Sequence, residues 1–475
     1  MRKLWLPLYL LGTCLVLPVS ARINREQLSA GDRPKRLIVV LDGVPYHTIA
    51  ELREEGGFRS FHAPARMVAT FPSLTNPSMI EILGVENSPG YEDHYYDREH
   101  DRLVGGFQDR VRGGSFIKGT FRQLFNYHAP ALRGSLAYIA QPIGAIIVAQ
   151  ADVAAFQRSF RQSHEPLFVA YIGATDSLAH LGGERPLKSL LRSLDRSIET
   201  LRAESVEGLS VEILSDHGNL YGEQRFVKLN AAIEGSDFSI EKSLAKPGAV
   251  ILPRYGLVGS AVLFTRPENR KKLAEVSAAT TGVDFAVYQQ PGEEGRAMTL
   301  VSRRGQARIE RQGTGFRYRD LGGDPLELNG VISLMESEGR MDQDGSASLD
   351  DWWQATREHR YPDALRRLFD GFTEHVRTPG DVLVSFEDGY LIGSPFFGAF
   401  ARMRATHGNL LSAETEGFAM STRIELGPAV RGRDVRRLFG LDEMRRAGQY
   451  LSTEGHCVQG LAMAQSFART TPREN

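Results

Sequence analysis

The sequence predicts an α/β fold with a mainly parallel central sheet flanked by helices. Three short runs are apolar almost throughout, which suits strands buried on both faces of a parallel sheet, and an aspartate closely follows each run. These runs and aspartates are Leu37–Leu41 with Asp42, Leu167–Gly173 with Asp176, and Val211–Leu214 with Asp216. After Pro186, leucine and isoleucine recur at helical spacing before the third run, which predicts a strand–helix–strand crossover.

The composition of the whole chain is that of a globular protein. Of 475 residues, 41% are hydrophobic and 24% are charged, which argues against wholesale disorder and against a multi-span membrane protein. The 57 basic and 58 acidic side chains nearly cancel, so the chain lacks the basic excess of a nucleic-acid-binding protein. The apolar segment Leu136–Phe156 is interrupted by polar residues, and we expect a buried core helix there rather than a membrane span.

The chain divides into a core and an insertion. Residues 22–224 and 373–475 are predicted to form one catalytic core. Between them, residues 225–372 hold shorter apolar segments broken by glycine, proline and charged residues, which indicates an α+β insertion or lid. We expect one helix from Leu349 to Phe372, and we expect the strand Val382–Phe386 to return the chain to the core.

Residues 1–21 have the pattern of an export signal. A basic start precedes an apolar run, and small residues then suit cleavage before Arg22, so an extracytoplasmic protein, periplasmic or secreted, is expected. An uncleaved membrane anchor is one alternative, although the apolar run is shorter than the ~20 residues of a spanning helix. Lipid attachment at Cys14 is another. Signal removal would leave Cys457 as the single cysteine, without a disulfide.

Four short motifs carry side chains of the types that bind metal ions. They are Asp42 after the first predicted strand, Asp176 and His180 after the second, Asp216 and His217 after the third, and His407 late in the chain. A lone aspartate here would fit a turn or a helix cap, and a lone histidine would fit a loop. The repetition favours a metal site, because parallel strands place their carboxyl ends along one edge of the sheet. Carboxylate and imidazole together favour zinc, or less selectively manganese or iron.

Thr75 is the candidate nucleophile. It precedes Asn76, which can cap a helix, and Pro77, which suits the first helical position. A hydroxyl just before a helix amino terminus would lie where the helix dipole and backbone amides attract a phosphate. A plain capping role for Thr75 fits the pattern equally well, and Thr70, which also precedes a Phe-Pro pair, competes as the nucleophile.

These motifs resemble the alkaline phosphatase superfamily, and within it the branch of type I phosphodiesterases, nucleotide pyrophosphatases and phosphonoacetate hydrolase. The matching segments are LIVVLDG, FPSLTNPS, ATDSLAH, LSDHG and THG, in the family's order. The resemblance implies an alkaline phosphatase-like fold and two divalent ions, with zinc preferred. It implies one ion held by Asp176, His180 and His407, and another held by Asp42, Asp216, His217 and the Thr75 oxygen. It further implies that Thr75 attacks phosphorus and forms a phospho-threonine, which water then hydrolyses.

The resemblance implies an exported, metal-dependent hydrolase of phosphate esters, of the phosphodiesterase or nucleotide pyrophosphatase type, with a small phosphorylated substrate. A phosphomonoesterase or a phosphonate hydrolase of the same superfamily is the alternative, and a non-catalytic binding protein on the same fold is the alternative of another class. A sulfatase would need a Cys-x-Pro-x-Arg-like setting, which neither cysteine has. Relatives often carry an asparagine beyond the nucleophile, whereas Gly90–Asp97 has none and contains Asp93. No substrate-binding residue is therefore assigned.

Overall fold

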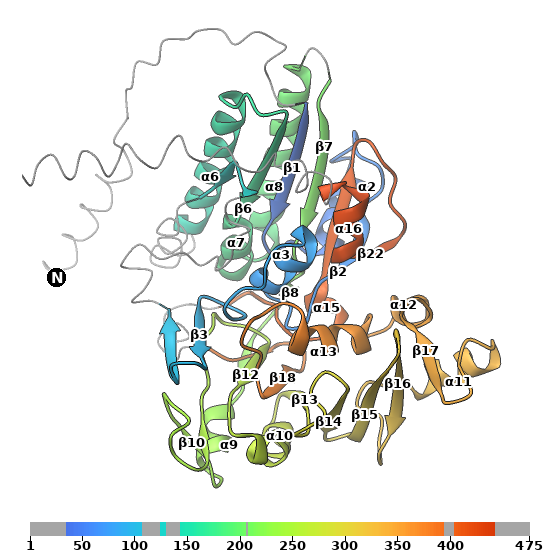
Figure 1. The fold of residues 1–475 in the computed structure, drawn as a ribbon. Helices are drawn as coiled ribbons and strands as arrows, with labels where there is room; N and C mark the ends of the chain where they lie inside the picture. The colour runs from blue at the N-terminus through green and yellow to red at the C-terminus, as the bar shows by residue number, and fades with distance from the viewer. Residues whose placement is uncertain (1–34, 107–123, 130–142, 206–207, 394–402, 442–475) are drawn as a thin grey trace, which may run out of the picture.

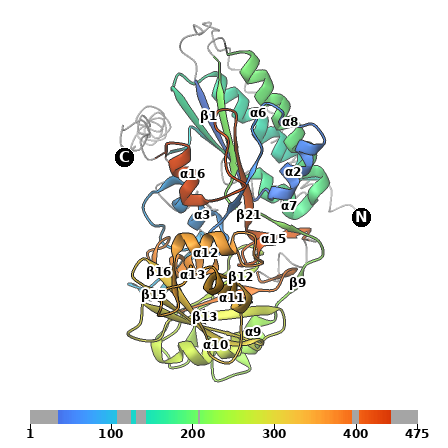
Figure 2. The same cartoon turned by 90° about the vertical axis from the view of Figure 1, so that its right-hand side faces the viewer.

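The computed structural model describes residues 35–106, 124–129, 143–205, 208–393 and 403–441. Two seven-stranded sheets dominate it and occupy opposite ends of the molecule (Figures 1 and 2). The predicted signal segment, both cysteines and residues 136–142 of the predicted core helix lie outside the described residues. Within the described ranges, no helix is both long and apolar enough to cross a membrane.

The central sheet has the predicted α/β form. Its strands are β1 (Arg36–Leu41), β2 (Ala65–Val68), β5 (Tyr127–His128), β6 (Leu167–Ile172), β7 (Ser210–Ser215), β21 (Glu416–Ser421) and β22 (Ala429–Arg431). They lie in the order β22-β2-β21-β7-β1-β6-β5, and every neighbouring pair is parallel except the two that include β21. Leu41 of β1 lies opposite Ile172 on one side and Ser215 on the other. The three predicted strands are therefore adjacent and end at one level.

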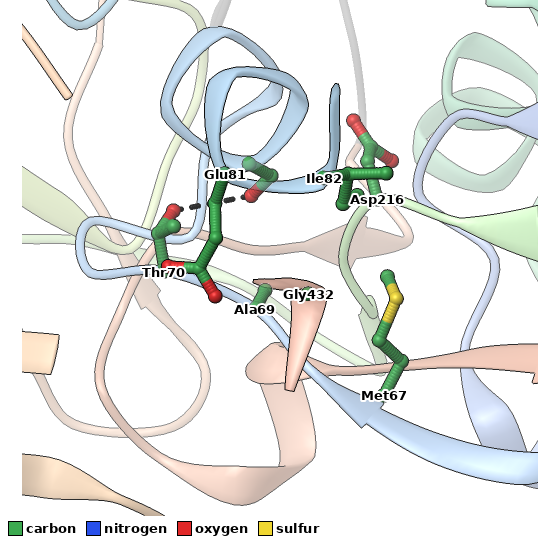
Figure 3. A pocket seen from close by; sticks show the side chains of 8 residues that line it. Met67, Ala69, Thr70, Glu81, Ile82, Asp216 and Gly432 are labelled. Atoms are coloured by element: carbon green, nitrogen blue, oxygen red, sulfur yellow. Dashed lines mark hydrogen bonds between the residues drawn. The ribbon is translucent and has the colours of Figure 1, made fainter. Parts of the chain in front are cut away.

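Two helices, α3 (Thr75–Leu83) and α16 (Gly432–Leu438), cover one face of this sheet. Their apolar side chains pack on Ile38 and Val40 of β1. Figure 3 shows a small hollow beneath α3, with Met67 of β2 and Ile82 of α3 on its wall. Because α3 crosses the sheet here, its first residue reaches the end of β1, where a hydrogen bond joins Thr75 to Asp42.

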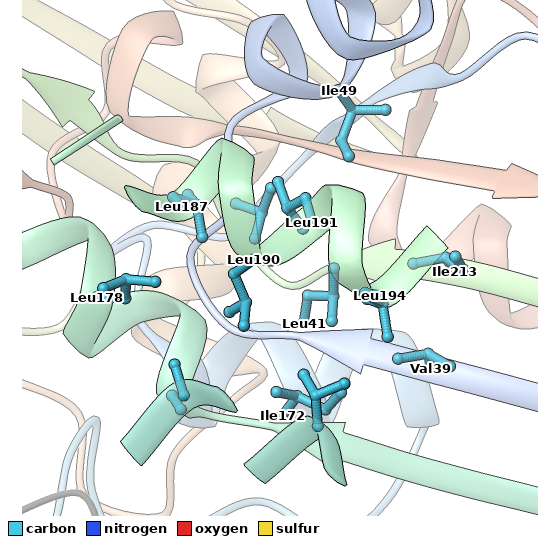
Figure 4. Packing of buried hydrophobic residues seen from close by; sticks show 14 of the residues in the cluster. Val39, Leu41, Ile49, Ile172, Leu178, Leu187, Leu190, Leu191, Leu194 and Ile213 are labelled. Carbon is cyan, nitrogen blue, oxygen red and sulfur yellow. The ribbon is translucent and has the colours of Figure 1, made fainter. Parts of the chain in front are cut away.

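Four helices cover the opposite face: α2 (Tyr46–Glu54), α6 (Ile143–Arg161), α7 (Ala174–Gly182) and α8 (Glu184–Ala203). Helix α8 confirms the predicted crossover between β6 and β7. Its leucines at the predicted positions are buried, and Figure 4 shows them over Val39 and Leu41 of β1. Helix α6 has one buried apolar face, which includes Val148 and Phe156, in agreement with the predicted core helix.

The second sheet is antiparallel throughout. Its strands are β12 (Ser260–Leu263), β13 (Val283–Tyr288), β14 (Ala297–Ser302), β15 (Gly305–Gln312), β16 (Gly315–Asp320), β17 (Ser346–Ser348) and β18 (Val382–Phe386), in the order β12-β18-β13-β14-β15-β16-β17. Helices α9 (Leu229–Glu234) and α10 (Arg270–Ala278) pack on one face. On the other face lie α11 (Asn329–Ser337), α12 (Leu349–Thr356) and α13 (Ala364–Thr373).

Short elements complete the described fold. They are the pairs β3 (His94–Asp97) with β4 (Arg102–Gly105), β8 (Leu220–Tyr221) with β20 (Ala405–Thr406), β9 (Arg225–Phe226) with β19 (Tyr390–Leu391), and β10 (Ser239–Ile240) with β11 (Ala249–Val250), together with η3 (Pro267–Asn269) and α15 (Ser412–Thr415). The pairing of β8 with β20 matters most for function. It holds the residues just before His407 against the segment that follows β7.

Two expectations for the region around residue 372 are wrong. The strand Val382–Phe386 does not return to the central sheet, because as β18 it pairs with β12 and β13 in the second sheet. The single helix expected from Leu349 to Phe372 is two helices, α12 and α13, and the segment between them contains Pro362 and Asp363, whose φ of +52° is incompatible with a continuous helix. The predicted domain limits stay a prediction. We propose that the unit built on the second sheet extends beyond residue 372 to include β18.

Candidate metal centre

The predicted metal-binding side chains gather at the carboxyl ends of the parallel strands. Asp42 directly follows β1, and Asp216 directly follows β7. Asp176 lies in the first turn of α7, and His180 follows it by one helical turn on the same face. The predicted convergence of the three aspartates follows from the shared register of β1, β6 and β7.

One group of ligands consists of Asp176, His180 and His407, whose candidate ligand atoms all lie within 4.8 Å of one another. Nε2 of His180 is 3.2 Å from Oδ2 of Asp176, and Nε2 of His407 is 3.8 Å from Oδ1 of the same carboxylate. Two of these residues come from α7, and the third comes from the segment after β20. Residues far apart in the sequence thus form one compact group.

A second group consists of Asp42, Asp216 and His217, again with candidate ligand atoms within 4.8 Å of one another. Nε2 of His217 lies 3.5 Å from Oδ1 of Asp42 and 3.7 Å from Oδ2 of Asp216. The two groups adjoin, because the rings of His217 and His407 stack with their centroids 3.9 Å apart. The six residues therefore form one continuous polar centre.

All three histidines are held in the same way. Their Nδ1 atoms hydrogen-bond to backbone carbonyl oxygens: Ala405 at 2.7 Å for His180, Gly218 at 2.8 Å for His217, and Ser73 at 2.8 Å for His407. A carbonyl oxygen only accepts, so Nδ1 carries the proton in each ring. In the neutral imidazole, Nε2 then presents its lone pair to the centre, which is the arrangement of a metal-binding histidine.

The chemistry of the donors fits divalent metal ions. Among the described residues, Oδ2 of Asp216 and Nε2 of His217 are buried without a hydrogen-bond partner. Buried polar atoms of this kind are costly unless something binds them. Two divalent ions, one in each ligand group, would satisfy these atoms, and the mixture of oxygen and nitrogen ligands suits zinc.

Crowding of buried carboxylates shifts the protonation of the centre. Burial, together with the charge of Asp176, raises the pKa of Asp42, and burial raises the pKa of Asp216 to about 7. Burial, with the charge of His217, holds the pKa of His407 well below its usual range. Burial acts to raise the pKa of Asp176, but the charge of His180 and its hydrogen bond to Asp176 outweigh burial and lower that pKa. Burial acts to lower the pKa of His217, but the charges of Asp216 and Asp42 outweigh it and raise that pKa to about 10. The carboxylates and histidines of the centre therefore partly balance one another's charge.

Thr75 lies beside the second group. Its Oγ1 donates a hydrogen bond of 3.3 Å to Oδ1 of Asp42. Thr75 is the first residue of α3, and Leu74, not Asn76, occupies the N-cap position, so the predicted cap is displaced by two residues. The side chain of Thr75 makes no capping bond, which leaves its hydroxyl directed at the centre.

Thr70, the competing nucleophile, is engaged elsewhere. It is buried, its hydroxyl lies 3.1 Å from the carbonyl oxygen of Pro72, to which it donates, and it also lies 3.1 Å from Oγ of Ser78. Figure 3 shows this contact under α3, near Glu81 and on the wall of the small hollow. The geometry therefore favours Thr75 over Thr70.

Three further residues support the centre, and the sequence analysis did not single them out. Tyr171 donates a hydrogen bond of 2.5 Å to Oδ2 of Asp42, and Thr175 donates one of 2.6 Å to the carbonyl oxygen of Asp42. Asn219 donates a hydrogen bond of 3.0 Å to Oδ1 of Asp176. Each is close in sequence to a predicted ligand, which was the available signal. Gly43 is needed for space as well: its φ is +63°, and a Cβ there would lie 2.5 Å from both Asn219 and Asp176.

A third group of similar composition consists of Glu81, Asp370 and His375, whose candidate ligand atoms also lie within 4.8 Å of one another. No sequence motif indicated this group. It differs in having cations of its own. Nη1 of Arg366 lies 3.0 Å from Glu81 and 2.7 Å from Asp370, and Arg433 lies 2.6 Å from Asp370. These guanidinium groups already neutralise the carboxylates, so we assign no metal to this group.

Comparisons with known proteins give structural similarity alone. No protein-family model matches the sequence, and a search of curated proteins finds no match. Among solved structures, the chain is similar to phosphonoacetate hydrolase from Sinorhizobium meliloti 1021 in complex with phosphonoacetate (12% identity, TM-score 0.48). It is also similar to human ectonucleotide pyrophosphatase/phosphodiesterase 5 (11%, 0.46) and to an inactive murine form in complex with AMP (10%, 0.45). Each comparison covers 86% of this chain and 95% of the other.

The proteins found are of the kind that the sequence motifs resemble, and the mainly parallel sheet agrees with the predicted fold. At identities of 10–12% and TM-scores of 0.45–0.48, we base the proposed function on the geometry of the site.

Proposed function

We propose that this protein is a metal-dependent hydrolase of phosphate esters with Thr75 as its nucleophile. The observation that carries the proposal is the pair of adjoining carboxylate–histidine groups, with buried atoms left without partners, directly beside the Thr75 hydroxyl. Buried polar atoms without partners are costly in a purely structural core, whereas bound divalent cations would satisfy them.

The ligand sets of the proposal follow the two groups. Asp176, His180 and His407 would hold one ion. Asp42, Asp216 and His217, with Oγ1 of Thr75, would hold the other. Zinc is the preferred ion for this donor set. When bound, such ions polarise a phosphoryl oxygen and lower the pKa of a nearby hydroxyl.

The chain's own residues then perform two tasks. The amino end of α3 favours the negative charge of a phosphate, because the helix dipole is positive there. Thr75 attacks phosphorus from this end, so that a new bond forms from its Oγ1 and the bond to the leaving oxygen breaks. The proton of the Thr75 hydroxyl is lost and the leaving oxygen gains one. Water then attacks phosphorus and the bond from phosphorus to Oγ1 breaks, which releases a phosphate monoester from a diester, or phosphate from a monoester, and restores the Thr75 hydroxyl.

Tyr171 and Asn219 keep two carboxylates oriented during these steps. Tyr171 binds one oxygen of Asp42 and leaves Oδ1 facing Thr75. Asn219 bridges the carbonyl oxygen of Gly43 and Oδ1 of Asp176, at 2.7 and 3.0 Å. Both side chains fix geometry without adding charge.

We further propose a phosphodiesterase or nucleotide pyrophosphatase type of activity on a small phosphorylated substrate, with export through residues 1–21. A phosphomonoesterase or a phosphonate hydrolase would use the same groups. The resemblance of the five motifs to that branch supports the diesterase.

The test is hydrolysis of bis(p-nitrophenyl) phosphate beside p-nitrophenyl phosphate, by chelated protein with and without added zinc. We expect turnover that zinc restores and that is faster with the diester. Faster turnover of the monoester would indicate a phosphatase. If zinc binds and neither ester is cleaved, phosphonoacetate is tested next, and failure with all three substrates would favour a non-catalytic binding protein.

A further inference from the structure

Arg367 is a fully buried arginine that pairs with no carboxylate among the described residues. It lies on α13, the helix that packs against the second sheet through Leu365 and Leu368. Burial, with the charge of neighbouring Arg366, lowers the pKa of Arg367 to about 9. A buried cation without a counter-ion is expensive, so its hydrogen bonds must stabilise something that the fold requires.

The guanidinium group of Arg367 binds backbone and hydroxyl oxygens of separate segments. Nη1 donates to the carbonyl oxygens of Pro362 and Leu410, at 3.0 and 2.9 Å. Nη2 donates to the carbonyl oxygen of Thr70 at 3.0 Å and to the hydroxyls of Ser73 and Thr415 at 3.3 and 2.7 Å. One rigid, planar group thus joins the segment before Thr75 to the segment after His407.

Ser73 connects the residues bound by Arg367 to both His407 and Thr75. Its carbonyl oxygen accepts the bond from Nδ1 of His407 at 2.8 Å, and its backbone N–H donates to Gly408 at 3.2 Å. Ser73 also lies two residues before Thr75. Displacement of the segment from residue 70 to 73 would therefore turn the His407 ring and move the nucleophile together.

Thr415 extends the connection to the second ligand group. Its hydroxyl lies 3.1 Å from that of Ser73, and its carbonyl oxygen accepts a bond of 3.3 Å from Gly218, the residue after His217. The segments that carry His217, His407 and Thr75 thus meet around one guanidinium group supplied by the second unit of the fold.

We propose that Arg367 is a positioning residue, which holds the segments of Thr75 and His407 in register so that both face the metal centre. Its effect on Thr75 rests on the proposed function, but its effect on His407 does not require turnover. The unit built on the second sheet thus contributes Arg367 to the support of the site, in addition to any part that it plays as a lid.

The test compares Arg367→Met with Arg366→Met in the full chain. Both arginines are buried neighbours on α13, but Arg366 binds the carboxylates of Glu81, Asp363 and Asp370 instead of the two segments. Zinc affinity is measured by competition with a chelator. We expect Arg367→Met to lower the affinity for one of the two zinc ions by about 10- to 100-fold, which is the usual effect of losing a residue that supports a metal ligand. Arg366→Met should lower the melting temperature and keep both affinities.

Hydrogen exchange of the chelated proteins provides a readout without metal or substrate. In Arg367→Met, amides of residues 70–76 and 407–418 should exchange faster relative to the rest of the described chain. In Arg366→Met, any faster exchange should follow the overall loss of stability and should not be concentrated in these two segments. If wild type cleaves no phosphate ester, the proposed function fails while this comparison still stands.

The proposal is overturned if folded Arg367→Met keeps wild-type exchange in both segments and wild-type affinity for both zinc ions. If Arg367→Met does not fold, Arg367→Lys and Thr415→Val replace it. Each removes part of the same hydrogen bonding, so each should show a smaller loss in the same direction. Wild-type exchange and zinc affinity in both of these variants would equally overturn it.

Discussion

Two kinds of buried carboxylate–histidine cluster occur in this protein, and their difference lies in charge balance. The metal centre has three aspartates and three histidines, and no arginine or lysine pairs with it among the described residues. In the third group, Glu81, Asp370 and His375, the carboxylates form ion pairs with Arg366 and Arg433. Similar residue types therefore form an incomplete site in one place and a closed ionic network in the other.

The protonation of the two clusters follows this difference. Burial, with the charge of Asp42, raises the pKa of Asp216 to about 7 even though His217 acts against it. Burial also acts on Glu81, but the charges of Arg366 and His375 outweigh it and hold that pKa well below the usual range. The arginine therefore keeps Glu81 ionised, although burial still raises the pKa of Asp370 in the same cluster.

Thr75→Ala should have the largest effect on turnover, and it tests whether the candidate metal centre is catalytic or purely structural. It removes the attacking oxygen but only one of several ligands, so turnover should fall by about 10³-fold or more while most zinc stays bound. Steady-state kinetics and metal analysis measure the two quantities. Thr70→Val is the matched control and should stay within about tenfold of wild type. Turnover of Thr75→Ala close to wild type would remove Thr75 as the nucleophile.

Arg366→Met tests the closed network from the other side. It leaves Glu81 and Asp370 buried without their main cation, so the free energy of unfolding should fall by about 3–5 kcal/mol. Urea unfolding of the metal-free protein measures this, and zinc affinity should be unchanged. A variant as stable as wild type would mean that Arg433 and His375 suffice to balance the carboxylates.

The pair His407→Ala and His375→Ala compares one histidine from each kind of cluster. His407→Ala should reduce zinc content from two ions towards one and lower turnover with it, because the first group loses a ligand. His375→Ala should retain both ions. Metal analysis after dialysis decides between them, and full zinc content in His407→Ala would exclude His407 as a ligand.

The smallest expected effect is a pH dependence carried by Glu81. Since its folded-state pKa lies below the ordinary 4.5, its contribution to stability is present above that value and is lost as pH falls through the folded pKa. The destabilisation caused by Glu81→Gln should therefore shrink between pH 7 and pH 4. Urea unfolding of chelated wild type and variant measures it. If the difference in unfolding free energy between wild type and Glu81→Gln does not change with pH, ionisation of Glu81 does not stabilise the fold.

Much of the fold could be predicted because it depends on short-range patterns. The apolar runs at β1, β6 and β7 and the leucine spacing of α8 were read directly from neighbouring residues. The strand Val382–Phe386 could not be placed in the same way. Its apolar sequence fits either sheet, and only its pairing with β12 and β13 decides which.

The candidate ligands could also be predicted, because each is adjacent to a strand end or to another ligand. The residues that support them could not. Arg367 and Thr70 are 297 positions apart, and Glu81 and Arg366 are 285 positions apart. No local pattern reports on such partners.

The sequence by itself determined the three strands that end in aspartate, the crossover helix and the residue types that the centre would contain. The tertiary structure alone decided which buried carboxylates pair with arginine and which do not. The physical reason is that strand and helix formation follow from the periodicity of nearby side chains, whereas the charge balance of a buried group depends on every charge that folding brings within a few ångströms.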